Sequence, residues 1–388
     1  MNFLFLSPHF PLHYYLFCQK LHEAGVKVLG IGEASPDSLP RHLADSLTDY
    51  YHVTNMEDYD QVVRAVGYFI HRHGRMDRVE SHNEHWLHME SDLRQDFNIP
   101  GMLPPEMAKV KRKSVMKEVF RSVGAPVARG EKFSSSEQAW AFAGSVGYPI
   151  FAKPDIGVGA NATFKIHNQH DLHAFLVQKP HDDYIMEEFI DGHLATFDGL
   201  TDRDGRIVFA ISHFSGTGVF EVVQENSDLS FYSLRDIPPD ILDLGTKSIH
   251  GFGIREKFFH LEFLRRHDNG SLIAMEINMR PPGGFTTDLM NFSCDIDVYR
   301  EWTNIVLGKP IVEGISHKYH SAHIARKSGK SYRHSHEEIL KRFSGKIMMF
   351  SEVSEIFSPV MGNFVYIGRS PDLSEIHEMI EFIQAKNG

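Results

Sequence analysis

Two strand-like runs around a tight turn place a pair of acidic residues face to face. The turn occupies residues 268–270, and its final glycine supplies the left-handed backbone on which a three-residue hairpin loop ends. This register pairs His267 with Ser271, so counting five places along each strand brings Glu262 opposite Glu276. In a regular antiparallel pair their Cβ atoms lie ~5 Å apart. Two carboxylates this close repel each other, so we expect a cation between them.

The same sheet face carries two more polar groups. Because side chains alternate along a strand, Asn278 and Arg280 point to the same side as Glu276. Two carboxylates and an amide oxygen are hard ligands that suit Mg²⁺, whose other positions are filled by water and phosphate oxygens. The guanidinium is a forked donor for a phosphoryl group or a substrate carboxylate. A solvated sheet face explains any one of these residues, but the set of four favours a metal and phosphate site.

The segment that ends in Arg280 resembles the metal-binding end of ATP-grasp enzymes, and most closely that of the carboxylate–amine ligases among them. The strand acid Glu262 precedes it, and Pro281-Pro282-Gly283-Gly284 follows it. The resemblance covers residues 1 to about 310 and implies ATP with Mg²⁺, or Mn²⁺ as an alternative ion. It implies metal ligands and substrate-binding residues as follows: Glu262, Glu276 and Asn278 for the metal, and Arg280, Gly283 and Gly284 for the substrate.

Two lysines match the nucleotide-contacting lysines of this family. Lys113 lies early in a helix, and Lys153 ends an apolar strand before a loop that contains Gly157 and Gly159. Their ammonium groups can balance triphosphate charge, and the N–H groups of a glycine loop approach phosphate oxygens without side-chain obstruction. A lysine on a helix is usually only solvated, whereas a lysine inside an apolar strand is unusual without an anionic partner. The resemblance implies Lys153 and Arg280 as the catalytic residues.

A short acidic and apolar segment resembles the hinge that family members press against adenine. Its residues are Glu187, Glu188, Phe189 and Ile190. One carboxylate would accept from the adenine amino group, and the alternative is an edge strand with exposed acids. Where the family has a ribose-binding glutamate this chain has Leu194, which cannot accept a hydroxyl proton, so Asp191 is the expected ribose contact.

The elements that must position these residues follow the order of an α/β protein. Residues 1 to about 104 alternate short apolar runs with amphipathic stretches, which predicts a parallel sheet with crossover helices. Gly30-Ile31-Gly32 lacks the last glycine of a dinucleotide fingerprint, so a nicotinamide site is not expected there. Pro104-Pro105 opens a predicted helix that Gly124 closes.

The predicted fold is a parallel-sheet α/β domain followed by a two-lobed ATP-grasp domain of α+β character. The first domain spans residues 1–104, and the ATP-grasp domain spans 105–310 with a small lid at about 125–190. Residues 311–388 are expected to complete the large lobe. They contain five closely spaced histidines with no cysteine nearby, and we interpret these as surface or packing residues rather than zinc ligands: His317, His320, His323, His334 and His336.

Composition and charge narrow the function classes. The chain has 388 residues, 42% hydrophobic and 23% charged, which is typical of a globular protein with two or three domains. A net charge of −11 disfavours nucleic acid and anionic membranes as partners, and no apolar run approaches the ~18 residues of a membrane span. Cys18 and Cys294 are expected to be free thiols, which indicates a cytoplasmic location.

The resemblance implies a reaction in two steps. A substrate carboxylate attacks the γ-phosphate of ATP, and an amine then displaces phosphate from the acyl phosphate, with amino acids as the default substrates. A homodimer is common in the family. Two alternatives stay open: a purine-pathway type of ATP-grasp ligase or carboxylase, and an ATP-binding regulatory protein without catalysis. A mere binder has no need for a face of mutually repelling acids, which argues against the last.

Overall fold

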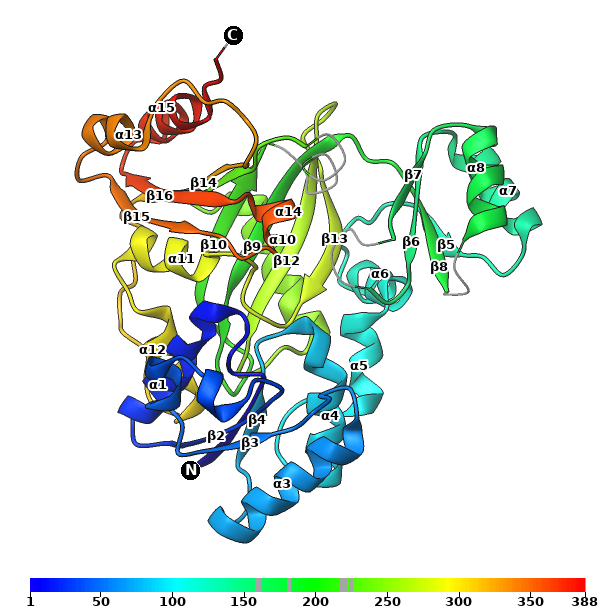
Figure 1. The fold of residues 1–388 in the computed structure, drawn as a ribbon. Helices are drawn as coiled ribbons and strands as arrows, with labels where there is room; N and C mark the ends of the chain where they lie inside the picture. The colour runs from blue at the N-terminus through cyan, green and yellow to red at the C-terminus, as the bar shows by residue number, and fades with distance from the viewer. Residues whose placement is uncertain (158–161, 180–182, 217–221, 223–225, 388) are drawn as a thin grey trace.

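The computed structural model describes residues 1–157, 162–179, 183–216, 222 and 226–387, and the strands in these ranges form three sheets (Figure 1). The first is a parallel sheet near the N-terminus with the strand order β3-β2-β1-β4, as the alternating pattern predicts. Its strands are β1 (Asn2–Leu6), β2 (Lys27–Gly32), β3 (Asp49–His52) and β4 (Arg78–Glu80). Helices α1 (Tyr15–Glu23), α3 (Tyr59–His73) and α4 (Leu87–Asp96) alternate with them.

Alternating apolar side chains give this parallel sheet two buried faces. Leu4 and Leu6 pack with α3 residues such as Phe69 on one face, while Phe3 and Phe5 point to the other. The second face joins a core that also contains Trp302 of helix α12 (Val298–Val306). The N-terminal sheet is therefore packed directly against the part of the chain that follows the predicted metal site.

The central sheet has eight antiparallel strands in the order β13-β12-β9-β10-β11-β14-β16-β15. Their bounds are β9 (Gly192–Thr201), β10 (Ile207–Ser215), β11 (Ser230–Leu234), β12 (Phe258–Arg266), β13 (Leu272–Asn278), β14 (His320–Arg326), β15 (Ile347–Glu352) and β16 (Phe364–Ser370). Helix α10 (Pro239–Phe252) packs on one face, and α11 (Thr286–Cys294) contacts β11, β14 and β16. Helices α13 (His336–Arg342) and α15 (Leu373–Gln384) complete the C-terminal part, which continues this sheet rather than forming a separate one.

A small antiparallel sheet, order β5-β8-β6-β7, projects to one side of the molecule (Figure 1). Its strands and the two helices that cover it are β5 (Gly130–Lys132), β6 (Ile150–Pro154), β7 (Phe164–Ile166), β8 (Tyr184–Glu188), α7 (Ser136–Val146) and α8 (Gln169–Gln178). Phe142, Ile150 and Phe175 belong to its own hydrophobic core. This sheet carries Lys153 and the first hinge acids.

The predicted helix that starts at Pro104 is two helices in the structure. α5 (Pro104–Lys111) ends where Arg112 adopts an extended backbone, and α6 (Lys113–Ser122) begins at the next residue. Buried Asp155 explains the break, because its carbonyl accepts from the Lys113 N–H at 2.9 Å and its carboxylate from the Ser114 N–H at 2.8 Å. The break makes Lys113 the first residue of a helix that is tied to the lid strand.

The hairpin of β12 and β13 brings Glu262 opposite Glu276, as expected, but by a different path. The Arg266 N–H donates to the Ser271 carbonyl at 3.0 Å, so the loop has four residues and the predicted pairing of His267 with Ser271 is wrong. A β-bulge then adds one residue on β13, between the partners of Glu262 and of the residue after it. The longer loop and the bulge shift the strand register in opposite directions, so Glu262 and Glu276 still lie opposite each other.

Other expectations concern the cysteines and the C-terminal histidines. Cys18 and Cys294 are both free and buried. His323 stacks on Phe231 and His334 on Phe382, while His336 lies 3.0 Å from a tyrosine hydroxyl, so these side chains serve packing and local hydrogen bonding. Among the helices that the structure describes, none has the length and apolar character that a membrane crossing requires.

Candidate active site

The acid pair and Asn278 form a compact polar group at the edge of the central sheet. The Asn278 amide N–H donates to the Glu276 carboxylate at 3.2 Å, and its own oxygen is buried with no hydrogen-bond partner among the described residues. Burial raises the pKa of Glu276, but Lys113 and Lys153 outweigh it and hold that pKa below its ordinary value. Two carboxylates beside an unsatisfied amide oxygen fit a hard divalent cation.

Lys113 reaches this acid group from helix α6. Its Nζ lies 3.5 Å from a Glu276 oxygen and donates to the Gly157 carbonyl at 3.2 Å. The side chain is only 7% exposed, so its positive charge acts in a poorly solvated place. Lys113 thus joins α6, the lid loop and the metal face, and Gly159 of the same loop lies outside the described residues.

The lid lysine has the anionic partner that its apolar strand predicts. Lys153 Nζ lies 2.5 Å from one oxygen of Glu187, and Lys117 Nζ lies 2.7 Å from the other. Burial raises the pKa of Glu187, but the two lysines lower it to about 2. Burial lowers the pKa of Lys117, whereas Glu187 outweighs burial at Lys153 and raises its pKa. The carboxylate therefore neutralises two ammonium groups within the protein.

The remaining hinge residues point in different directions. Glu188 lies on the opposite side of β8 from Glu187 and pairs with Arg129 at 2.7 Å. Phe189 packs under the Lys165 ammonium, and Ile190 is buried. Of the four predicted hinge residues, Glu187 is the one whose side chain contacts the two lysines.

Among the described residues, no hydrogen bond or ion pair links Asp191, the expected ribose contact, to these lysines. Asp191 is exposed, and its carboxylate lies 3.0 Å from a ring nitrogen of His267 in the hairpin loop. Leu194 is the third residue of β9, pairs with Leu264 and is half-buried. The role of Asp191 in ribose binding therefore stays a prediction.

Arg280 extends the polar face toward the N-terminal sheet. Its guanidinium lies 3.3 Å from Glu84, a buried acid that follows β4. The other carboxylate oxygen of Glu84 lies 3.5 Å from Lys111 Nζ at the end of α5. Glu84 and Lys111 were not predicted from the sequence, because their neighbours in the chain carry no motif and the contact spans 196 positions.

The glycine pair after Arg280 lies under a C-terminal segment. Gly284 has a positive φ of 64°, and a Cβ there would lie 3.1 Å from the sulfur of Met361 in α14 (Ser358–Met361). The Gly283 carbonyl accepts from the Thr286 hydroxyl at 2.6 Å, next to the start of α11. Both the backbone conformation and the limited space at Gly284 thus favour glycine.

Behind Glu262 lies a buried chain of polar side chains that the sequence did not predict. The ring of His260 bridges Glu262 at 3.0 Å and Asp198 at 2.6 Å. Asp198 also lies 2.7 Å from His213 of β10. Burial lowers the pKa of His260, but Asp198 and Glu262 outweigh it and raise the pKa to about 10, while that of Asp198 falls to about 2. The imidazolium therefore holds one metal-face carboxylate in place.

The sequence contains one indication of this network of buried polar side chains. His260 stands two positions before Glu262 in a predicted strand, so the two share a face of the sheet. Asp198 had no such signal, because its neighbourhood depends on the pairing of β9 with β12.

Comparisons with known proteins identify similar sequences and similar folds. No protein-family model matches the sequence. The chain is 28% identical over 278 residues to an L-arginine-specific L-amino acid ligase of Bacillus subtilis, which covers 67% of this chain and 66% of that protein. It is 26% identical over 182 residues to the carbamoyl phosphate synthase large chain of Bifidobacterium longum, covering 43% of this chain and 16% of that one. The matches thus span less than two thirds of each relative.

Solved structures resemble the whole chain. The L-amino acid ligase from Bacillus licheniformis superposes with a TM-score of 0.74 and 16% identity, covering 100% of this chain and 99% of that one. The N5-carboxyaminoimidazole synthetase from Staphylococcus aureus, complexed with ADP, gives 0.73 and 14%, covering 97% and 95%. The chain therefore has the ATP-grasp fold that its sequence predicts, and its sequence is similar to those of an L-amino acid ligase and a carbamoyl phosphate synthase large chain.

Proposed function

We propose that the chain is an ATP- and Mg²⁺-dependent ligase that joins a carboxylate to an amine and releases ADP and phosphate. One observation carries the proposal: Lys113 of α6 lies 3.5 Å from Glu276 of β13, which pairs with Glu262, and the charge of Lys153 in the lid also stabilises the Glu276 carboxylate. Cations for a triphosphate and acids for a divalent ion thus share one place. The proposed division at residues 104 and 310 places all four residues in the central domain.

We assign the metal to Glu262, Glu276 and Asn278. When bound, Mg²⁺ would neutralise phosphate charge and orient the triphosphate. The chain itself contributes the ammonium groups of Lys113 and Lys153, which stabilise negative charge on the transferring phosphoryl group. His260, held by Asp198, keeps the Glu262 carboxylate oriented.

The proposed chemistry needs no covalent nucleophile from the protein. In the first step a carboxylate oxygen of the substrate attacks the γ-phosphorus, the bond to the ADP oxygen breaks, and an acyl phosphate forms. In the second step the amine attacks the acyl carbon, phosphate leaves, and one proton from the amine is released to solvent. Arg280 offers its fork to the carboxylate or to the transferring phosphate, and the glycines after it let the substrate approach the backbone.

Amino acids are the proposed substrates because the similar Bacillus proteins are named as L-amino acid ligases. Arginine specificity belongs to the relative, and this chain's acid and amine are to be found by screening.

A cytoplasmic location and a homodimer are further parts of the proposal, and neither nucleic acid nor membrane is a proposed partner. The sequence also predicts the loop at 215–221 as a cover for the substrate, and residues 217–221 lie outside the described residues.

The test is a screen of ADP and phosphate release with ATP and Mg²⁺ over pairs of amino acids, with mass spectrometry of the products. A condensation product that needs both acid and amine supports the ligase. ADP release that needs bicarbonate and no amine would favour a carboxylase of the purine-pathway type. Calorimetric ATP binding with no product across the screen would favour a regulatory ATP-binding protein.

A further inference from the structure

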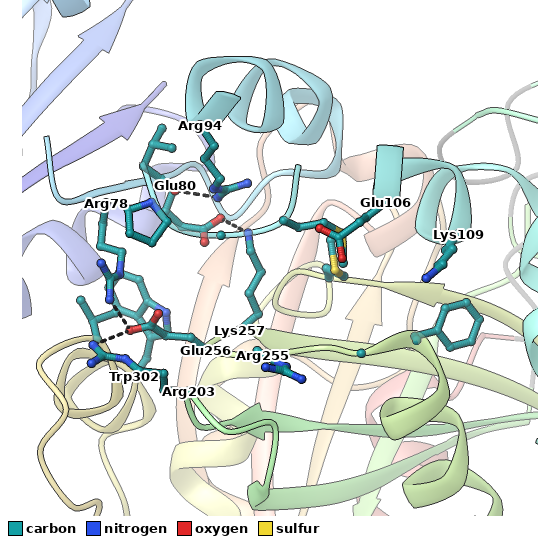
Figure 2. A pocket seen from close by; sticks show the side chains of 18 of the residues that line it. Arg78, Glu80, Arg94, Glu106, Lys109, Arg203, Arg255, Glu256, Lys257 and Trp302 are labelled. Atoms are coloured by element: carbon teal, nitrogen blue, oxygen red, sulfur yellow. Dashed lines mark hydrogen bonds and ion pairs between the residues drawn. The ribbon is translucent and has the colours of Figure 1, made fainter. Parts of the chain in front are cut away.

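A cleft of about 560 Å³ lies between the N-terminal sheet and the start of β12, separate from the metal-binding acids (Figure 2). Its walls come from β1, β4, α5, α12 and the turn between α10 and β12. Glu262 and Glu276 are not among its lining residues. The cleft is therefore a second concave site with its own chemistry.

Positive charge predominates in these walls, although the chain as a whole has a net charge of −11. Six lining residues are cationic and three are acidic, an excess of three. The cations are Arg78, Arg94, Lys109, Arg203, Arg255 and Lys257, and the acids are Glu80, Glu106 and Glu256. A cleft with low-dielectric walls concentrates such an excess of one sign and attracts ligands of the other.

Two of the six cations are buried and are balanced by protein acids. Lys257 lies 2.7 Å from Glu80, and Arg94 lies 2.8 Å from Glu90, which sits behind the wall. These four side chains are nearly inaccessible to solvent. They are a structural network and leave little charge for a ligand.

The positive charge of the other four cations is only partly balanced. A single oxygen of Glu256 serves both Arg78, at 3.2 Å, and Arg203, at 3.4 Å. Within the residues that the structure describes, no acid lies at ion-pair distance from Arg255 or Lys109. Figure 2 shows Arg78, Arg203, Glu256 and Trp302 gathered at one end of the cleft and Lys109 at the other.

Two buried donors at the first end lack acceptors. The indole N–H of Trp302 and the Nε of Arg78 are both inaccessible to solvent and have no hydrogen-bond partner in the described part of the chain. Each group can only donate. Leaving such donors unpaired is unfavourable, so the end of the cleft that they line suits a ligand rich in acceptor oxygens.

We propose that this end of the cleft binds a small acidic metabolite through a phosphate or carboxylate group. The oxygens of that group accept from the guanidinium groups of Arg78 and Arg203, which share one oxygen of Glu256, and Arg255 adds positive charge at the mouth. The buried indole of Trp302 lies at the same end of the cleft and reports on binding there. The site does not depend on the proposed ligase reaction, because its residues lie outside the nucleotide and metal groups.

The chain offers a local probe for this site. It contains three tryptophans, so ¹⁵N-tryptophan labelling gives three indole signals, and a Trp302→Phe variant identifies that of Trp302. Titration with inorganic phosphate, and separately with succinate, at constant ionic strength is expected to shift the Trp302 signal saturably and leave the other two in place. A response to phosphate alone indicates a phosphorylated ligand, and a response to succinate alone indicates a carboxylate.

Charge-removing variants measure the contribution of single residues. Arg78→Gln leaves Arg203 on Glu256 and is expected to weaken the titration roughly 10- to 100-fold. Arg255→Gln, an exposed change at the mouth that leaves the buried network intact, is expected to weaken it about threefold. Arg41→Gln removes a charge of a 95% exposed side chain outside the cleft and is the matched control, expected to change nothing.

Three outcomes would overturn the proposal. One is a Trp302 signal that stays still while phosphate raises the melting temperature, because phosphate then acts elsewhere. Another is a shift of all three indoles in proportion to salt. The third is equal weakening by Arg255→Gln and Arg41→Gln, which would reduce the effect to general surface charge.

Discussion

The metal face and the cation-rich cleft both lie beside β12. They differ in the type of buried polar atom that each leaves without a hydrogen-bond partner. On the metal face the buried orphan is an acceptor, the amide oxygen of Asn278, and carboxylates surround it. In the cleft the orphans are donors on Trp302 and Arg78, and cations are in excess. The type of unpaired atom therefore indicates the sign of the charge that a ligand carries at each site. The net charge of the whole chain, −11, does not distinguish the two sites.

The largest expected effect concerns the metal face. Glu276→Ala removes the carboxylate that Lys113 and Asn278 contact, so ADP release should fall roughly 10³-fold or more while the circular dichroism spectrum stays the same. Glu352→Ala, an exposed acid of β15 on the other edge of the same sheet, should keep full activity. If the turnover of Glu276→Ala stays within tenfold of the wild type, Glu276 is not a metal ligand and this sheet face is not a metal site.

The lid lysine comes next. Lys153→Met removes one of the two cations that Glu187 neutralises, and the affinity for ATP should fall roughly 100-fold in calorimetry. Lys132→Met, on the edge strand β5 of the lid sheet, is the control and should bind ATP as the wild type does. Equal affinities in the two variants would show that Lys153 only satisfies Glu187.

Asp198→Asn tests whether buried polar side chains support the metal ligands. With a neutral partner His260 orients Glu262 less firmly, so the Mg²⁺ concentration for half-maximal activity should rise roughly 10- to 100-fold. A purely structural role would lower the melting temperature without moving this midpoint. Asp204→Asn, in the turn between β9 and β10, is the control for loss of an aspartate charge.

The same network predicts a pH dependence of stability. The pKa of His260 is raised from 6.5 to about 10, so its stabilising contribution is complete below pH 6.5 and is lost progressively as the pH rises to 10. The free energy of unfolding of the wild type relative to His260→Gln should therefore decrease between pH 7 and pH 10. A difference that stays constant over this range would mean that His260 is neutral in the folded protein.

The smallest effect concerns the ribose contact. Leu194→Glu introduces the acceptor that the resemblance to ATP-grasp enzymes implies at this half-buried position beside Leu264, and should lower the KM for ATP about threefold. Leu194→Gln has a similar size and carries no charge, so it separates hydrogen bonding from electrostatics. If Asp191→Asn raises the KM instead and Leu194→Glu leaves it unchanged, Asp191 is the ribose contact.

Sequence reasoning succeeded where local patterns decide the structure. The alternating strands around the hairpin place Glu262 and Glu276 on one face, and the apolar strand before Lys153 predicts its buried acid partner. Local patterns cannot give contacts between distant segments. Glu84 meets Arg280 only because the N-terminal sheet packs against the end of β13, and no periodicity in either segment encodes that packing.

The break between α5 and α6 was missed for a related reason. The apolar spacing continues across Arg112 as if the helix were unbroken, and what ends α5 is Asp155, a side chain from the lid. An intrinsic propensity cannot anticipate a cap that arrives from 41 positions away.

The bulge on β13 affects how related proteins are recognised from their sequences. Because a bulge absorbs one added residue in a strand, the number of positions between Glu262 and Glu276 can change by one while the two carboxylates keep facing each other. A search that demands a fixed interval between the acids will overlook such chains. One that scores alternation on each strand separately will retain them, and a deletion of Met275 alone would remove the bulge and leave Glu276 opposite Glu262.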